Sequence, residues 1–446
     1  MTAGEDPNYD RPTRPTAPVV NGVSFLIVLL VAWLGPGVTL AFAQSPPTDL
    51  AIKFYQSRAA RDPTDFFPYA KLGAAYIQKA RESGDVTYYG LAEKALGQAL
   101  RLRPDPPMVA GVTTLLALVH FARHEFRDAL ASAEQAVGQG AAGLFAYTVI
   151  GDAYVELGDY DRAESAYARL LGLTGPAHPH SRLAYLRFLR GDPPAAIAEM
   201  QRAVGAVVAA SVPRENVAWT QFSLADLWFQ VGDLDRSEAA CRDALASYPG
   251  YHRAVAALAR IEAARRRYPQ AVELYRRALA VIPLPEYAAA LGDVMLKQGH
   301  VRDAKQQYEL VEYIGRLNAI NQVIHNRELA LFLADHDLKP QQALELARRE
   351  LEVRRDVYTH DVLAWALYRN GRLEEALAQM TEALGMGTRD ARLYFHAGLI
   401  HHALGQAQPA RAYLERALAT NPYFHLLHAD VARDVLVQLA HPAGLP

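Results

Sequence analysis

The chain has 446 residues, 51% of them apolar, so it is long enough to bury a large core. Its 46 Lys and Arg nearly balance 48 Asp and Glu, which excludes the basic excess of a protein that binds nucleic acid or anionic lipid through bulk charge. The single cysteine, Cys241, excludes an intramolecular disulfide framework and a multi-cysteine metal site.

The N-terminal segment has the layout of an export signal. Arg11 and Arg14 lie in a polar leader, an apolar run follows at residues 23–34, and Ala41-Phe42-Ala43 forms a small-x-small site. These features predict a signal peptide that is cleaved after Ala43. Residues 23–43 are also roughly long enough to span a bilayer, so an uncleaved inner-membrane anchor is the alternative. Either form predicts that the rest of the chain is periplasmic or secreted.

After a linker and lead-in at residues 44–65, the chain repeats one unit. The clearest copy has bulky residues at helical spacing around Gly151, a turn at Gly158-Asp159, and a second apolar periodicity that begins at Ala163. We call the two predicted helices of each unit helix A and helix B. Ten copies can be followed by the small residue of helix B, which is Ala92, Ala129, Ala163, Ala196, Ser237, Ala271, Ala304, Ala343, Ala376 or Ala410. Six of the nine spacings are 33 or 34 residues, which identifies a repeat array.

The unit resembles the tetratricopeptide repeat, which has W-x2-L-G-x2-Y on helix A and A-x3-F-x2-A on helix B. The resemblance covers about residues 66–422 and implies an all-α fold, a right-handed α-solenoid (superhelix) of about ten helical hairpins. Gly73, Gly151 and Gly292 fall where helix A would cross helix B too closely for a large side chain. Long spacings predict insertions near residues 81–89, 205–213, 314–324 and 335–340. An apolar helix at about residues 424–439, within the tail 423–446, is expected to cap the last hairpin.

In such a superhelix, the helix A residues that do not pack line a concave groove. The register places a series of aromatic side chains there, and large rings suit the capture of a peptide or protein segment. The same rings would instead be buried if the superhelix is wound tightly. A second series, Asp152, Asp226 and Asp293, directly follows the small helix A residue and predicts carboxylates that bind basic or amide groups, or that pair with Arg260. The predicted groove residues are Phe145, Asp152, Tyr185, Phe188, Trp219, Phe222, Asp226, Phe229, Asp293, Tyr358, Trp365 and Tyr368.

Residues for catalysis are not evident. The sequence has no phosphate loop, nucleophile elbow or HExxH motif, and the repeats leave no room for a catalytic domain, so we expect no enzyme activity and no cofactor. His425 and His428 have the spacing of a metal-binding pair on one helix face, although half-buried structural histidines are the alternative. Cys241 takes the bulky position of helix B, which predicts a buried packing thiol.

Together these features predict an exported scaffold for protein–protein interaction, with no nucleic-acid partner and with membrane contact only through the N-terminal segment. Two other functions fit the sequence. One is a metal-handling or metal-regulated envelope protein that uses the C-terminal histidines. The other is a docking subunit of a secretion or envelope enzyme complex.

Overall fold

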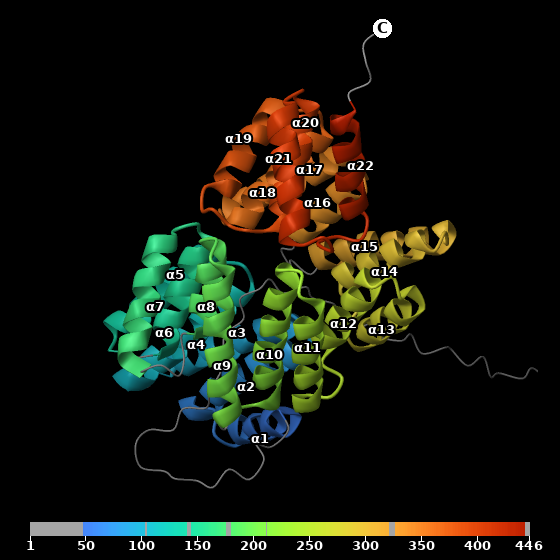
Figure 1. Cartoon of the computed structure of the whole chain (residues 1–446). Coiled ribbons are helices and arrows are strands. Elements are labelled where there is room, and N and C mark those ends of the chain that lie inside the picture. The colour runs from blue at the N-terminus through green and yellow to red at the C-terminus, as the bar shows by residue number, and fades with distance from the viewer. Residues whose placement is uncertain are drawn as a thin grey trace, which may run out of the picture.

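The computed structural model describes residues 48–102, 105–140, 144–174, 180–210, 212–320 and 326–441. The predicted export segment lies outside these residues. Within them the chain forms 22 α-helices, packed as consecutive antiparallel hairpins (Figure 1). The predicted all-α array of ten hairpins is therefore confirmed, with α1 (Thr48–Arg61) before the first hairpin and α22 (His428–Ala440) packed on the last. None of the described helices is long and apolar enough to cross a membrane.

Even-numbered helices correspond to helix A and odd-numbered helices to helix B. The A helices are α2 (Phe66–Ser83), α4 (Pro106–Ala122), α6 (Leu144–Glu156), α8 (His180–Leu189), α10 (Arg214–Gln230), α12 (His252–Ala264), α14 (Pro285–Lys297), α16 (Asn326–Asp335), α18 (Val357–Arg369) and α20 (Ala391–Ala403). The B helices are α3 (Thr87–Arg101), α5 (Phe126–Gly138), α7 (Tyr160–Thr174), α9 (Pro193–Ala209), α11 (Leu234–Ser247), α13 (Tyr268–Val281), α15 (Val301–Ile320), α17 (Pro340–Val353), α19 (Leu373–Leu384) and α21 (Ala407–Thr420).

Two residues determine the turn between helix A and helix B, one with positive φ and one that caps helix B. Each of the ten turns has a residue with positive φ just after helix A, and seven of these are glycines, the residue for which this conformation carries no steric penalty. In several turns an aspartate follows and caps helix B; the Asp192 carboxylate accepts from the backbone N–H of Ala195, and Asp233 accepts from Arg236. The Gly-Asp pair seen in the sequence thus ends one helix and starts the next.

The small residues of helix A are required by the crossing with helix B. A Cβ atom added at Gly151 would lie 2.3 Å from the ring of Tyr167 on helix B, and one at Gly292 would lie 2.4 Å from the ring of Tyr308. Cys241 takes the same helix B position as these tyrosines and is fully buried, and burial raises the pKa of its thiol to about 12. The predicted packing role of Cys241 is confirmed.

One of the predicted insertions, near residues 81–89, is visible between α2 and α3. Gly84 precedes the helix B alanine Ala92 by eight positions, whereas Gly158 precedes Ala163 by five, so the first hairpin has three additional residues between its turn glycine and this alanine. Other long spacings are absorbed by longer helices, such as the 17 residues of α9 and the 20 residues of α15.

The superhelix is wound so tightly that its successive turns touch. The backbone N–H of Arg355 donates to the carbonyl of Glu156 at 2.9 Å, and the Asn421 side-chain amide donates to the carbonyl of Phe229 at 2.8 Å, across a separation of 192 residues. Thr388 Oγ1 donates to the carbonyl of Leu189 across 199 residues. One buried apolar cluster accordingly joins helices of the first four hairpins to helices of the last three. Figure 1 shows these C-terminal hairpins, in orange and red, above the green helices α6–α11.

Candidate functional site

The predicted groove aromatics do not line an open surface. Trp365 is 0% exposed, Phe229 is 2% exposed and Phe188 is 3% exposed, so the expectation that these rings face solvent is wrong. Phe145, Tyr185, Trp219, Phe222, Tyr358 and Tyr368 are half-buried. Phe188 and Phe229 pack into apolar clusters of their own and neighbouring hairpins, and Trp365 packs against α20 and α22, so the chain itself covers these rings.

The Trp365 ring makes all of its described contacts within the chain. Its indole stacks on Tyr368 with centroids 4.7 Å apart and on His396 with centroids 4.2 Å apart. The indole N–H donates to Asp335 Oδ1 at 2.9 Å, and the Arg369 guanidinium lies 4.5 Å from the ring centroid. Trp365 therefore organises the core between α16, α18 and α20, and its ring cannot contact a ligand in this structure.

The three aspartates are also satisfied within the chain. Asp152 accepts from the Tyr167 hydroxyl at 2.7 Å and lies 3.4 Å from the Arg182 guanidinium of the next hairpin; Asp226 pairs with Arg260. The alternative that Asp226 pairs with Arg260 is confirmed. The expectation of an open carboxylate ladder for basic ligands is wrong, because each carboxylate joins its own hairpin or the next one.

Asp293 belongs to the same series but has a different environment. It accepts from the Tyr308 hydroxyl at 2.7 Å and from His336 Nε2 at 2.8 Å, and His425 Nε2 lies 3.7 Å away. Burial alone would raise the pKa of Asp293, but the hydrogen bond and charge of His336, with the Tyr308 hydrogen bond, outweigh it and lower that pKa. Asp293 also lines a cavity.

This cavity, of about 310 Å³, lies between the A-helix side of the sixth and seventh hairpins and the C-terminal segment that folds back over them. We call it the α12–α14/α22 cleft. Its walls are α12, α13 and α14 on one side and residues 422–433 on the other. Tyr268, Tyr275, Tyr423 and Phe424 contribute aromatic surface, and Tyr423 is 39% exposed.

Positive charge exceeds negative charge in the α12–α14/α22 cleft. Its lining includes four cationic side chains, Arg260, Arg266, Lys297 and Arg433, and two carboxylates, Asp293 and Asp430. Lys297 and Arg433 both pair with Asp430, and the Lys297 hydrogen bond holds the pKa of Asp430 below its usual value. Arg266 lies in the turn between α12 and α13 and is exposed. The cleft therefore suits a ligand with acidic and apolar groups.

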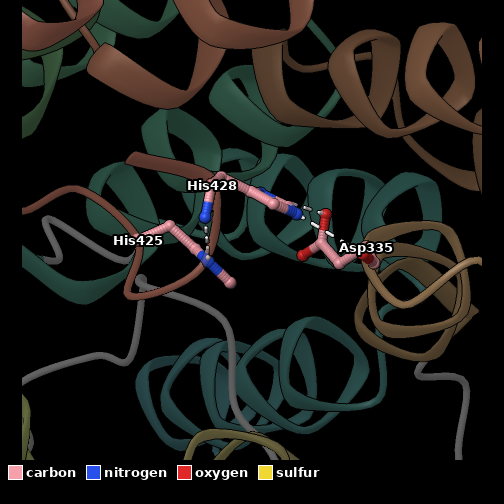
Figure 2. Close-up of side chains that lie close together, drawn as sticks. All are labelled: Asp335, His425 and His428. Atoms are coloured by element: carbon pink, nitrogen blue, oxygen red, sulfur yellow. Dashed lines mark hydrogen bonds and ion pairs between the residues drawn. The ribbon is translucent and has the colours of Figure 1, made fainter. Parts of the chain in front are cut away.

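Beside this cleft the fold gathers histidines and carboxylates from distant repeats. Asp335 ends α16, His425 lies in the segment before α22, and His428 is the first residue of α22 (Figure 2). One potential ligand atom from each of the three lies within 4.8 Å of the other two. The imidazoles of His425 and His428 are stacked, with centroids 4.1 Å apart. Burial lowers the pKa of each of these histidines to about 3, so both rings are neutral near pH 7.

Sequence reasoning found one half of this cluster. The spacing of His425 and His428 was visible, but Asp335 is 90 positions earlier and only the superhelical winding brings it near. The cations of the cleft were likewise not predicted, since Arg266 in the sixth hairpin and Arg433 in α22 are 167 positions apart. No local sequence signal connects such pairs.

Comparison with known proteins agrees with this architecture. A family profile described as tetratricopeptide repeat matches residues 148–210, 222–288 and 362–423. These segments correspond to hairpins of the fold described above, and they show that the chain contains tetratricopeptide repeats. No curated protein sequence matches it.

Several solved structures are similar at low sequence identity. The yeast Tom70 structure is 15% identical, with 89% of this chain and 93% of that chain covered and a TM-score of 0.40. PilW, described as a widely conserved type IV pilus biogenesis factor, is 19% identical, with 45% of this chain and 90% of that chain covered and a TM-score of 0.38. MamA is 19% identical, with 40% and 95% covered and a TM-score of 0.31.

Proposed function

We propose that this protein is an exported interaction scaffold that holds a segment of a partner protein in the α12–α14/α22 cleft, and that it acts by binding and not by catalysis. Tetratricopeptide repeats generally bind proteins, and such arrays use the face lined by helix A. Much of that face is filled here by the chain itself. The cleft is a place on the A-helix side of the array where side chains still surround a cavity.

The excess of cations over carboxylates in the cleft lining is the observation that carries this proposal. Counted with Asp226, which pairs with Arg260, four cationic side chains face three carboxylates, and this excess favours a partner segment with acidic side chains or a free carboxyl terminus. The tyrosine and phenylalanine rings add surface for its apolar side chains. This replaces the acidic groove predicted from the sequence, because Asp152 and Asp226 are satisfied internally.

The test uses charge reversal with a matched control. Arg266→Glu combined with Tyr423→Ala changes two exposed positions of the cleft, while Arg276→Glu reverses an exposed charge on α13, outside the cleft lining. Binding of acidic, neutral and basic peptide pools to the full chain is measured by fluorescence anisotropy. We expect the acidic pool to bind wild type and Arg276→Glu, and to bind the cleft variant at least about tenfold more weakly. Equal affinities for all three pools, or equal binding by the cleft variant, would refute the cleft assignment.

Export is tested separately. The chain is expressed with its native N-terminus in a Gram-negative host, the cells are fractionated, and the mature N-terminus is determined by mass spectrometry. A periplasmic product that begins at Gln44 supports a cleaved signal, and a full-length product in the inner membrane supports an anchor. Recovery of the intact chain in the cytoplasm would contradict both. Partners isolated from the envelope fraction then tell whether the protein docks onto a secretion or enzyme complex.

A further inference from the structure

We propose that Asp335, His425 and His428 form a binding site for one divalent transition-metal cation of the zinc class. The argument for this site does not rest on the partner-binding proposal, although the site shares His425 with the cleft and joins the eighth hairpin to the C-terminal segment. Two imidazoles and one carboxylate are the ligand types that Zn²⁺ and its neighbours prefer, whereas Mg²⁺ and Ca²⁺ prefer oxygen ligands alone. Figure 2 shows the three side chains converging from their separate segments.

The first argument is an unusual arrangement of lone pairs around Asp335. His428 Nε2 lies 3.4 Å from the backbone carbonyl of Asp335, which assigns the proton to that nitrogen and leaves Nδ1 with a lone pair. Nδ1 lies 4.0 Å from Asp335 Oδ1. Among the described residues this nitrogen is buried and has no hydrogen-bond partner. A lone pair thus faces a carboxylate oxygen with no proton between them, and a cation would satisfy both.

His396 repeats this arrangement from another helix. Its Nδ1 donates to Asp361 Oδ1 at 2.7 Å, so its Nε2 carries the lone pair, and that nitrogen is 4.0 Å from the same Asp335 oxygen. Within the described part of the chain, Nε2 of His396 is also buried without a hydrogen-bond partner. Buried polar atoms that lack a partner are rare and call for an explanation such as a bound ion. Two of them on one carboxylate strengthen the assignment.

The second argument is that the surroundings hold the ligands in place. The Trp365 indole N–H fixes the Asp335 carboxylate, and the Asp335 backbone carbonyl orients His428. Partners of this kind typically orient the ligands of metal sites. His425 Nδ1 accepts from the backbone N–H groups of Leu427 and His428 at 3.2 and 3.3 Å, and ligation would exchange these long hydrogen bonds for a metal bond.

The distances between the three ligand atoms fit a zinc site if the atoms move slightly closer together. Zn–N and Zn–O bonds of about 2.0–2.1 Å in tetrahedral geometry place ligand atoms about 3.4 Å apart. The atoms here lie within 4.8 Å of one another, so the widest pair would close by roughly 1.4 Å. His425 lines the α12–α14/α22 cleft, which provides a path for the ion from solvent. Bound there, the ion would fasten residues 425–428, part of one cleft wall, to α16.

The test is Zn²⁺ titration of the full chain, carrying no affinity histidines, by isothermal calorimetry. The variants are His425→Gln and His428→Gln, and the control is the double variant His401→Gln/His402→Gln, which removes two half-exposed histidines of α20. We expect one Zn²⁺ per chain for wild type and control. Each single variant should bind more than about 100-fold more weakly, since loss of an outer partner alone costs 10- to 100-fold.

A second measurement separates ligation from folding. His425 is half-buried, so His425→Gln should keep the far-UV circular dichroism of wild type. In wild type, Zn²⁺ should slow hydrogen exchange in residues 421–430, and in His425→Gln it should not. The proposal is overturned if wild type shows no saturable Zn²⁺ binding, or if the control variant loses binding while His425→Gln and His428→Gln keep it.

Discussion

The contact between successive superhelical turns can be tested at Gly191. This residue has φ +73° in the turn between α8 and α9, and a Cβ atom there would lie 2.2 Å from the carbonyl oxygen of Gly387, one superhelical turn away. Gly371 has φ +70° in the corresponding turn of the ninth hairpin, but an added Cβ would meet nothing within 4 Å. Gly191→Ala and Gly371→Ala therefore share the free-energy cost of an alanine with positive φ. Only Gly191→Ala adds a clash with the next superhelical turn.

The two substitutions should differ by about 2 kcal/mol. A left-handed conformation costs an alanine about 1–2 kcal/mol, which applies to both. For Gly191→Ala the two turns must also separate by roughly 1 Å to reach an ordinary C···O contact. That shift breaks the neighbouring buried hydrogen bond from Thr388 to the Leu189 carbonyl, at a cost of about 1–3 kcal/mol.

The assay is native-state hydrogen exchange followed by mass spectrometry, because repeat arrays often depart from two-state unfolding. Peptides that cover residues 185–192 and 384–392 report on the two sides of the contact. In Gly191→Ala both peptides should exchange their amide hydrogens about 30-fold faster than in Gly371→Ala. This ratio corresponds to a difference of about 2 kcal/mol in the free energy of opening. Equal exchange in the two variants, or a change confined to residues 185–192, would show that the turns do not touch in solution.

Two further predictions concern buried side chains. Burial, together with the neighbouring Arg253, lowers the pKa of His252 to about 3, and its Nδ1 lies 2.8 Å from the Tyr287 hydroxyl. The contribution of the neutral imidazole to stability is therefore present above pH 6.5 and is lost as the pH falls toward 3. Between pH 7.5 and 5 the free energy of opening around α12 should drop by about 2 kcal/mol from this residue. His252→Gln, followed by native-state hydrogen exchange at both pH values, should remove that drop. An unchanged pH dependence would contradict the assignment. Trp365→Ala should lower stability by about 3–5 kcal/mol. Trp219→Ala should lower it by clearly less, because Trp219 is half-buried whereas Trp365 is fully buried. Equal urea midpoints for the two variants would argue against the core around Asp335.

The repeat array could be predicted from the sequence because its determinants are local. Gly151 must be small since it touches Tyr167, only 16 positions later, and the Gly-Asp turn needs no information from elsewhere. Each hairpin repeats the same short-range requirements, so ten copies reinforce one pattern. The cap was also predictable as an apolar helix, although α22 begins at His428, four residues after the expected start.

The fate of the concave face could not be predicted in this way. Trp365 is buried because α16, α20 and α22 pack around it, and His428 of α22 lies 63 positions later in the sequence. Nothing near either residue in the sequence indicates the other. The histidine pair at 425 and 428 was recognisable by its spacing, but its carboxylate partner was not, for the same reason.

The closed winding has a consequence for how the protein is made. In an open solenoid each repeat contacts only its neighbours, so folding proceeds repeat by repeat as the chain emerges. Here the end of α6, with the buried Glu156, meets its partner Arg354 only 198 residues later. At 5–20 residues per second the ribosome needs roughly 10–40 s to supply that segment. For that interval the first hairpins expose surfaces meant for the next turn, and a chain truncated before residue 354 would keep them exposed for good.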